Sequence, residues 1–207
     1  MYQRKDRFYR RAKSVGYRSR AAFKLIELDR RFRLLRSGDH VVDLGAWPGG
    51  WLQVAAQRVG TKGLVVGVDL TPIEPLAGPV ACVIGDARDD ATLAKVGERC
   101  HGRVDVVLSD MAPQLSGVRA ADEARATELA TSALNAAEIL LRPGGRLLIK
   151  LFQSDESIRF VDGLRREFNS VKLTRPEATR TGSAELYVVA EGFHASPRVD
   201  SEQRRNS

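Results

Sequence analysis

The alternation of short apolar runs with helix-length segments is the feature that most constrains the fold of this 207-residue chain. From residue 34 onward, runs rich in valine, leucine and isoleucine are separated by segments with helical periodicity. We expect strands at 40–44, 64–69, 80–84, 104–108, 146–152, 171–174 and 184–190, and helices at 19–36, 51–59, 90–99, 123–141 and 156–168. This order predicts an α/β fold in which a mostly parallel sheet carries helices on both faces.

The connection before the last strand has a different character. Only residues 175–183 separate the final two strands, which suits a hairpin, so the last strand is expected to run antiparallel to the others. Ser19 is the expected cap of the first helix, and Gly60 is expected to end the second. We expect one domain at 17–191, a basic N-terminal arm at 1–16 and a polar, disordered tail at 192–207.

Composition excludes several classes of protein. No apolar run approaches the ~18 residues of a membrane span, and the basic start lacks the apolar core of a secretory signal. Two cysteines cannot build a disulfide framework or a thiolate metal site, and three histidines show no ligand spacing. We therefore expect a cytoplasmic protein without a metal and, because no extra domain or heptad pattern is present, a monomer.

Positive charge is concentrated at the N-terminus. Residues 1–36 contain 13 lysines and arginines against three acids, a balance of +10, whereas the other 171 residues carry 20 against 23, or −3. A basic segment on such a body is typical of an anion-binding surface, and nucleic acid is the favoured partner because many phosphates need many cations. The alternative is a solvated arm. The aromatic residues among these cations are expected either to stack on bases or to anchor the arm: Tyr2, Phe8, Tyr9 and Tyr17.

The turn after the first strand indicates the kind of cofactor. In open α/β sheets, ligands bind beyond the carboxyl ends of the strands, where the sequence Val-Asp-Leu-Gly-Ala-Trp-Pro-Gly-Gly-Trp occupies 42–51. A dinucleotide fingerprint needs glycine two positions after Gly45, but Trp47 stands there and obstructs a pyrophosphate. Asp43 adds a carboxylate that repels a diphosphate. A cationic, phosphate-free nucleoside such as S-adenosylmethionine is therefore favoured.

Aspartates follow the next two strands. Asp69 ends the second strand 24 residues after Gly45, about the distance at which an acid accepts hydrogen bonds from a ribose diol. The alternative is that Asp69 caps a turn or helix. Asp86, after the third strand, is placed either to accept a hydrogen bond from an adenine amino group or to cap the following helix.

The later strands indicate the acceptor. Methyltransferases that act on base amines usually carry an aromatic residue after the fourth strand, and those that act on pyrimidine carbon need a cysteine. The segment Ser-Asp-Met-Ala-Pro at 109–113 has neither, which leaves transfer to oxygen. Lys150 lies inside an apolar strand, where burial of an ammonium is costly, so a functional role is favoured over a structural ion pair. Glu185 alone would be interpreted as solvent-exposed.

Five segments in order resemble one known family. They are Arg-Ser-Arg-Ala-Ala-Phe-Lys-Leu at 18–25, the turn at 42–51, Ser-Asp-Met-Ala-Pro at 109–113, Lys-Leu-Phe-Gln at 150–153 and Ser-Ala-Glu-Leu-Tyr at 183–187. Together they resemble the FtsJ-type ribosomal RNA 2′-O-methyltransferases, which use S-adenosylmethionine to methylate a uridine ribose in the A-loop of large-subunit rRNA. Trp47 departs from this pattern where a small residue is usual, and Gln114 departs where an asparagine is common.

The resemblance implies a Rossmann-like class I methyltransferase fold with a seven-stranded sheet. It implies S-adenosyl-L-methionine as cofactor and 23S rRNA, within the large ribosomal subunit, as substrate. The active site that it implies consists of Lys24, Asp110, Lys150 and Glu185. The cofactor contacts that it implies are Gly49, Trp51, Asp69, Asp86 and Asp110.

A ribose hydroxyl is a weak acid, so the reaction needs a general base beside it. Our hypothesis is that Lys150 is this proton acceptor, as a neutral amine whose charged form is disfavoured by partial burial and by Lys24 nearby. Asp110 would orient Lys150, and Glu185 would position Lys24 or the ribose. The alternatives are a ribose methyltransferase acting on tRNA or another RNA, a non-catalytic RNA-binding module, and a nicotinamide-dependent oxidoreductase, against which Trp47 argues.

Overall fold

A single mixed sheet organises the computed structural model, which describes residues 7–113, 116–180 and 182–194. In the described chain the sheet has seven strands in the order β3-β2-β1-β4-β5-β7-β6. The strands are β1 His40–Leu44, β2 Leu64–Asp69, β3 Val80–Ile84, β4 Val104–Ser109, β5 Leu141–Phe152, β6 Phe168–Thr174 and β7 Glu185–Phe193. Neighbours from β3 to β5 pair in parallel, whereas β7 runs antiparallel to both β5 and β6. The predicted fold class and the antiparallel last strand are confirmed.

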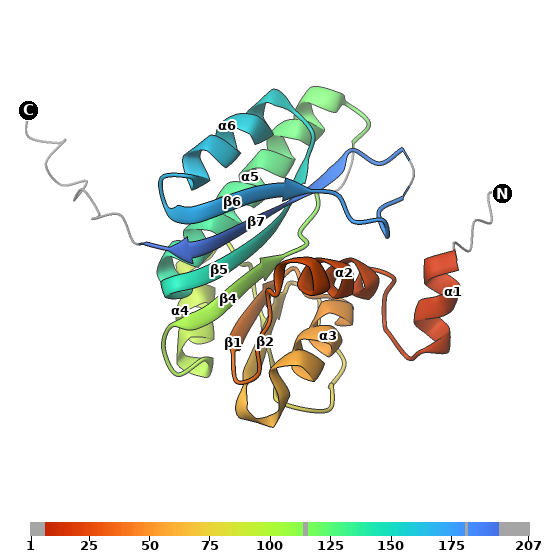
Figure 1. The fold of residues 1–207 in the computed structure, drawn as a ribbon, viewed down its shortest axis with the longest axis vertical. Helices are drawn as coiled ribbons and strands as arrows, with labels where there is room; N and C mark the ends of the chain where they lie inside the picture. The colour runs from red at the N-terminus through yellow and green to blue at the C-terminus, as the bar shows by residue number, and fades with distance from the viewer. Residues whose placement is uncertain (1–6, 114–115, 181, 195–207) are drawn as a thin grey trace, which may run out of the picture.

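Helices cover both faces of the sheet (Figure 1). They are α1 Arg7–Ser14, α2 Ala22–Phe32, α3 Gly50–Val59, α4 Asp90–Arg99, α5 Arg119–Leu140 and α6 Asp155–Leu164, with a short 3₁₀ turn at Gly60–Lys62. Alternate strand residues enter two cores: Val42 and Leu44 pack in the core that includes residues of α4, α5 and α6, whereas Val41 packs with α2 and α3. Within the described residues, no helix is long and apolar enough to cross a membrane.

The first predicted helix is shorter than 19–36. It begins after Ala21, whose side chain makes no capping bond, so the expectation that Ser19 caps it was wrong. It ends because Arg33 adopts a left-handed conformation with φ of 52° and donates its backbone N–H to the Asp29 carbonyl. From this helix end the chain enters β1 at its amino end, which lies at the opposite side of the sheet from the carboxyl ends of the parallel strands.

Other predicted boundaries also moved. The helix expected at 156–168 ends at Leu164, and Phe168 instead begins β6, where it packs against Phe193. Phe168 is an apolar residue four positions after Leu164, which is the spacing expected in a helix. The sequence pattern therefore did not reveal that the helix ends at Leu164. β5 begins at Leu141 rather than at residue 146. β7 continues to Phe193, beyond the predicted end of the last strand at residue 190; residues 195–207 of the predicted tail lie outside the described residues.

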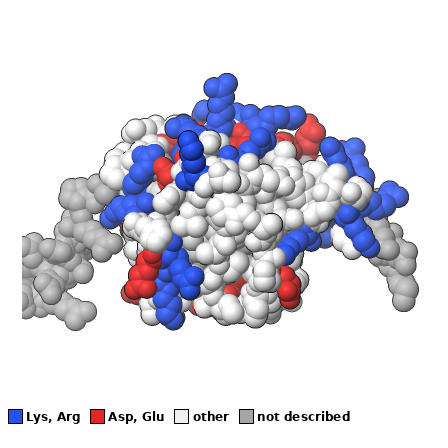
Figure 2. Space-filling model, turned by 90° about the horizontal axis from the view of Figure 1, so that it is seen from below, with Lys and Arg blue, Asp and Glu red and all other residues white. Residues whose placement is uncertain are grey.

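The basic arm contains a helix that is docked on the domain (Figure 1). Ala12 of α1 is buried with Phe23 and Ala178, and the Phe8 ring lies 5.7 Å from the Phe23 ring. Tyr17 packs edge-on against Phe23, so these two arm aromatics act as anchors. Tyr9 is exposed, and Tyr2 lies outside the described residues. In Figure 2, lysines and arginines gather at the right of the view, and also along the upper edge and at the lower left, around a largely uncharged centre.

Candidate active site

A cavity of about 730 Å³ lies at the carboxyl ends of the parallel strands, within the usual size of a small-molecule site. Its wall includes Asp69 from β2, Asp86 after β3 and Asp110 after β4. Residues of α5, among them Glu128, close another side. Three of the predicted site aspartates are thus brought to one cavity, because consecutive parallel strands present their ends at the same edge.

Gly45 forms part of this wall, and no other residue fits its place. Its φ is +75°, in the left-handed region that side chains rarely adopt. A Cβ added there would lie 2.6 Å from Cγ of Met111, which also lines the cavity. The turn after β1 therefore needs glycine both for its backbone conformation and for its close approach to the segment that follows β4.

Asp69 both caps a turn and lines the cavity. Its Oδ1 accepts the Thr71 backbone N–H at 2.8 Å, and its Oδ2 accepts the Trp47 backbone N–H at 2.9 Å. Each carboxylate oxygen can accept a second hydrogen bond, so the capping and diol-binding interpretations are compatible. Trp47 contributes this backbone contact, while its side chain is 57% exposed and does not line the cavity.

Asp86 is engaged by a neighbour. Arg88 Nε and Nη2 donate to its carboxylate at 2.7–3.0 Å, and the Arg88 backbone N–H also donates to Oδ1 at 2.9 Å. These hydrogen bonds hold the pKa of Asp86 below its ordinary value. Arg88 also reaches Glu128 of α5 at 3.3 Å, so it spans from β3 to α5. A ligand amino group at Asp86 would share the carboxylate with Arg88.

The four residues of the implied active site meet on the face of the sheet covered by α2. Lys24 Nζ lies 2.8 Å from Glu185 Oε2, and Lys150 Nζ lies 3.0 Å from Asp110 Oδ1. Lys150 also donates to the main-chain carbonyl of Asp110 at 2.8 Å. Both lysines are buried. Because Asp110 also lines the cavity, it joins the two parts of the site.

Tyr187 is a member of this cluster that the sequence analysis did not single out. It lies opposite Lys150 in the β5–β7 register, with no exposed surface. Its hydroxyl accepts from Lys24 Nζ at 3.0 Å and donates to Asp110 Oδ1 at 2.7 Å. The two lysine–carboxylate pairs are therefore connected. In a strand with an alternating pattern, a tyrosine resembles an ordinary core residue. Its place in the cluster depends on the pairing register of β5 with β7, which the sequence does not show.

Asp43 is a second residue that the predicted site omitted. It is buried in β1, and neither carboxylate oxygen has a hydrogen-bond partner within the described residues. Burial, followed by the charges of Asp110 and Asp69, raises the pKa of Asp43 well above its ordinary value. A carboxylate in this position favours a positive charge nearby. The signal in the sequence was an acid inside an otherwise apolar strand, at a strand end.

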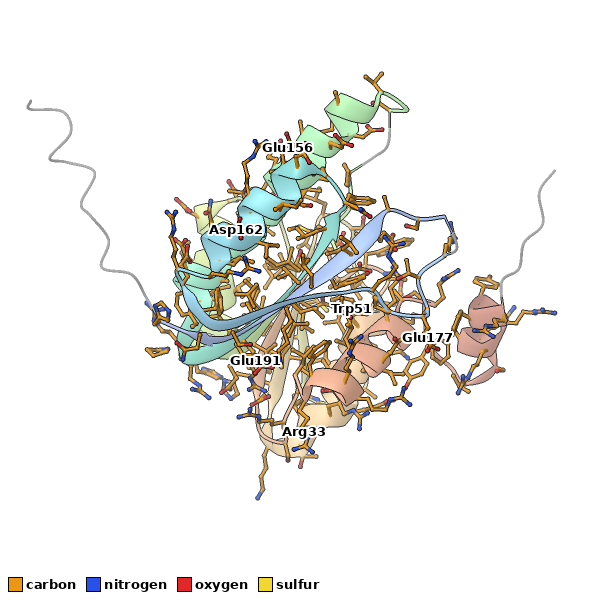
Figure 3. All side chains as sticks on the ribbon, turned by 45° about the horizontal axis from the view of Figure 1, so that its top comes forward. Arg33, Trp51, Glu156, Asp162, Glu177 and Glu191 are labelled. Atoms are coloured by element: carbon orange, nitrogen blue, oxygen red, sulfur yellow. The ribbon has the colours of Figure 1, made fainter. Side chains whose placement is uncertain are left out.

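Two predicted cofactor contacts lie elsewhere. Trp51, labelled near the centre of Figure 3, is buried; its indole N–H donates to the Ala21 carbonyl, and its ring lies 6.1 Å from that of Tyr187. Gly49 precedes α3 with φ of 103° and approaches Arg18 and Leu76. Neither lines the cavity. Gln114 lies outside the described residues.

Comparison with known proteins places the chain in a family. Residues 17–193 match the FtsJ-like methyltransferase model. The chain is 47% identical to a ribosomal RNA large subunit methyltransferase E from Methanothrix thermoacetophila, over 93% of this chain and 74% of that protein. It is 48% identical to the protein of the same name from an Azoarcus species, over 89% of this chain and 90% of that protein. The structure of a ribosomal RNA methyltransferase from Plasmodium falciparum superposes with a TM-score of 0.77 at 29% identity, covering 86% of this chain and 98% of that one. On these matches and the shared fold, the chain belongs to the FtsJ-like methyltransferase family.

Proposed function

We propose that this protein transfers the methyl group of S-adenosylmethionine to the 2′-hydroxyl of a uridine ribose in the A-loop of 23S rRNA, within the large ribosomal subunit. The observation that carries the proposal is the position of Asp110. This residue lines the cavity and also holds Lys150, so a methyl donor and a proton acceptor would meet at one side chain.

The residues around the cavity fit S-adenosylmethionine. The donor carries a sulfonium and an ammonium but no phosphate, and the site offers carboxylates on three strand ends together with the unpartnered, buried Asp43. Asp69 would accept the ribose hydroxyls, and Asp86 the adenine amino group. The family assignment supports the same cofactor. When bound, S-adenosylmethionine supplies an electrophilic methyl group.

Lys150 is arranged to act as the base. A neutral amine has two hydrogens and one lone pair. The two acceptors beside Nζ, the Asp110 Oδ1 and the Asp110 carbonyl oxygen, would take both hydrogens. The lone pair is then left to accept the proton of the ribose hydroxyl as its oxygen attacks the methyl carbon. Fixing Nζ at two points also favours catalysis through positioning.

Lys24 has a different role. Its ammonium is held by Glu185 at 2.8 Å and by the Tyr187 hydroxyl at 3.0 Å. In this setting Lys24 is a fixed positive charge that favours the neutral form of Lys150 and the developing alkoxide of the ribose. Of the two roles predicted for Glu185 from the sequence, positioning Lys24 or the ribose, this ion pair favours the first.

The substrate is supported by the relatives and by charge. The curated relatives carry the name ribosomal RNA large subunit methyltransferase E. The docked helix α1 presents a basic surface suited to RNA phosphates, with Arg10 and Lys13 exposed. A compact enzyme of this kind is suited to reading a preformed ribosomal surface, which favours the subunit over free rRNA.

A transfer assay tests the proposal. The purified protein and S-adenosylmethionine with a labelled methyl group are incubated with unmethylated large subunits, free 23S rRNA or tRNA, and the RNA is digested to nucleosides. We expect label in 2′-O-methyluridine from the subunit. Label in a methylated base would contradict transfer to the ribose. Label in tRNA alone would favour the alternative RNA substrate, and no label with bound cofactor would favour a non-catalytic module.

A further inference from the structure

We propose that Tyr187 is a positioning residue of the active site, which keeps Lys150 ready to accept a proton by sharing the Asp110 carboxylate with it. The proposal rests on the proposed function and goes further, because it assigns a role in proton transfer to a buried side chain that does not line the cavity.

The geometry places the Tyr187 hydroxyl between two charged pairs. Its oxygen accepts a hydrogen from Lys24 Nζ at 3.0 Å, and its hydrogen is donated to Asp110 Oδ1 at 2.7 Å. The same Oδ1 atom lies 3.0 Å from Lys150 Nζ. Asp110 Oδ1 therefore accepts a hydrogen bond from Tyr187 and is at the same time paired with Lys150.

Sharing this oxygen affects how strongly Asp110 holds a proton on Lys150. A carboxylate favours the charged form of a neighbouring lysine. A hydrogen bond from the tyrosine withdraws part of the negative charge at Oδ1, and Lys24 polarises that bond in the same direction. Asp110 thus orients the Lys150 amine while attracting its extra proton less than an isolated carboxylate would.

The hydroxyl remains a donor at any pH at which the enzyme works. Burial, followed by the charge of Asp110, raises the pKa of Tyr187 well above its ordinary value. The ring itself is fixed by the core, since it packs in the α2 and α3 core with Trp51. Removal of the hydroxyl alone therefore leaves the packing in place.

The charged groups around this hydroxyl come from several elements. Lys24 lies on α2, Glu185 on β7, Lys150 on β5 and Asp110 after β4, and Asp43 of β1 interacts electrostatically with Asp110. In the Tyr187→Phe variant all five of these ionisable side chains remain. Any change in the ionisation that controls turnover then reports the loss of the hydroxyl.

The test is the pH dependence of kcat for Tyr187→Phe with saturating S-adenosylmethionine and large subunits. Without the hydroxyl, Asp110 stabilises the protonated base more strongly. The apparent pKa of the ionisation that controls kcat should rise by about one unit. The free energy of a hydrogen bond to a charged group corresponds to a pKa shift of roughly one to two units. The variant should therefore be about tenfold slower at low pH and approach the wild-type rate at high pH, with KM for cofactor and RNA unchanged.

Tyr17→Phe is the matched control. It also removes one tyrosine hydroxyl with a side-chain partner, because Tyr17 Oη donates to Gln57 Oε1 at 3.0 Å. We expect its pH profile to equal that of the wild type. An unshifted profile for Tyr187→Phe, whether its rate is normal or uniformly reduced, would overturn the proposal while leaving the methylation of RNA established. Failure of the wild-type enzyme to methylate any RNA would instead refute the proposed function.

Discussion

The two ends of the active site are built differently. At the Asp110 end, the side chains of both lysines are less than 10% exposed, and each lysine is paired with a carboxylate. At the Asp86 end, the carboxylate is 31% exposed and its partner Arg88 is 49% exposed. The first end is therefore more buried than the second.

The difference follows from what each end has to do in the proposed reaction. Proton transfer needs groups fixed to within fractions of an ångström, and burial strengthens the electrostatic interactions among them. A cofactor must enter, and its product must leave, which fits the position of the aspartates proposed to bind it on the accessible wall of the cavity. Substitutions at the Asp110 end should thus reduce turnover, and those at the Asp86 end should reduce cofactor affinity.

The largest expected effect is at the Asp110 end. Lys150→Ala removes the proposed base, and Lys150 itself does not line the cavity. Methyl transfer should fall by at least ~100-fold, the lower range for general acid–base catalysis. Single-turnover kinetics measure the loss, and calorimetry should show unchanged cofactor affinity. Near-normal turnover would mean that Lys150 has a structural role. The Asp110 and Asp86 ends would then not divide turnover and cofactor binding between them as proposed.

Asp69→Ala should show the opposite pattern. Loss of a charge-assisted hydrogen bond to a ribose hydroxyl costs ~1.5–3 kcal/mol, so cofactor affinity should fall roughly tenfold or more. Turnover at saturating cofactor should change much less. Because Asp69 also accepts two backbone N–H groups, its melting temperature should fall as well. A lower melting temperature with unchanged affinity would show that Asp69 only caps the turn.

The basic arm lies outside both ends and should affect RNA binding alone. Arg10→Gln with Lys13→Gln removes two exposed charges from α1. If both contact phosphates, the slope of log affinity against log salt should become shallower by about 1.4–1.8. The control is Lys95→Gln with Arg99→Gln, which also removes two positive charges, in this case from α4. Equal slopes in the two double variants would mean that α1 is not a phosphate-binding surface.

The smallest expected effect is on stability, at Asp43. Burial raises the pKa of this carboxyl, so its contribution to stability is complete below the ordinary pKa of an aspartate and is lost as pH rises through the folded-state value. At neutral pH, Asp43→Asn should therefore raise the melting temperature of the cofactor-free protein by a few degrees. The additional stabilisation by S-adenosylmethionine should shrink. A lower melting temperature in the variant would contradict an unpartnered, buried carboxylate.

The sequence predicted regular elements best where local and tertiary signals agree. β1, β2, β3 and α4 have the predicted bounds, because valine-rich runs and an amphipathic segment are limited by glycines and aspartates. Boundaries failed where tertiary pairing decided them. Phe168 joins β6 because its ring is buried against Phe193, and Leu141 joins β5 because it pairs with Val104.

The site was predictable to the extent that it depends on strand ends. Asp69, Asp86 and Asp110 follow parallel strands, so their convergence on one cavity could be anticipated. Contacts across the sheet could not. The place of Tyr187 depends on its register with Lys150, and the engagement of Asp86 depends on the rotamer of Arg88. Neither the strand register nor the side-chain rotamer produces a periodic pattern in the sequence.

We have proposed that this protein methylates a ribose of large-subunit rRNA with Lys150 as the base. The most direct measurement maps 2′-O-methylation across 23S rRNA from cells that contain the gene, that lack it, or that carry Lys150→Ala. The account predicts one uridine in the A-loop that is methylated with the intact gene and unmethylated in the other two. An identical methylation map in all three cells would contradict it.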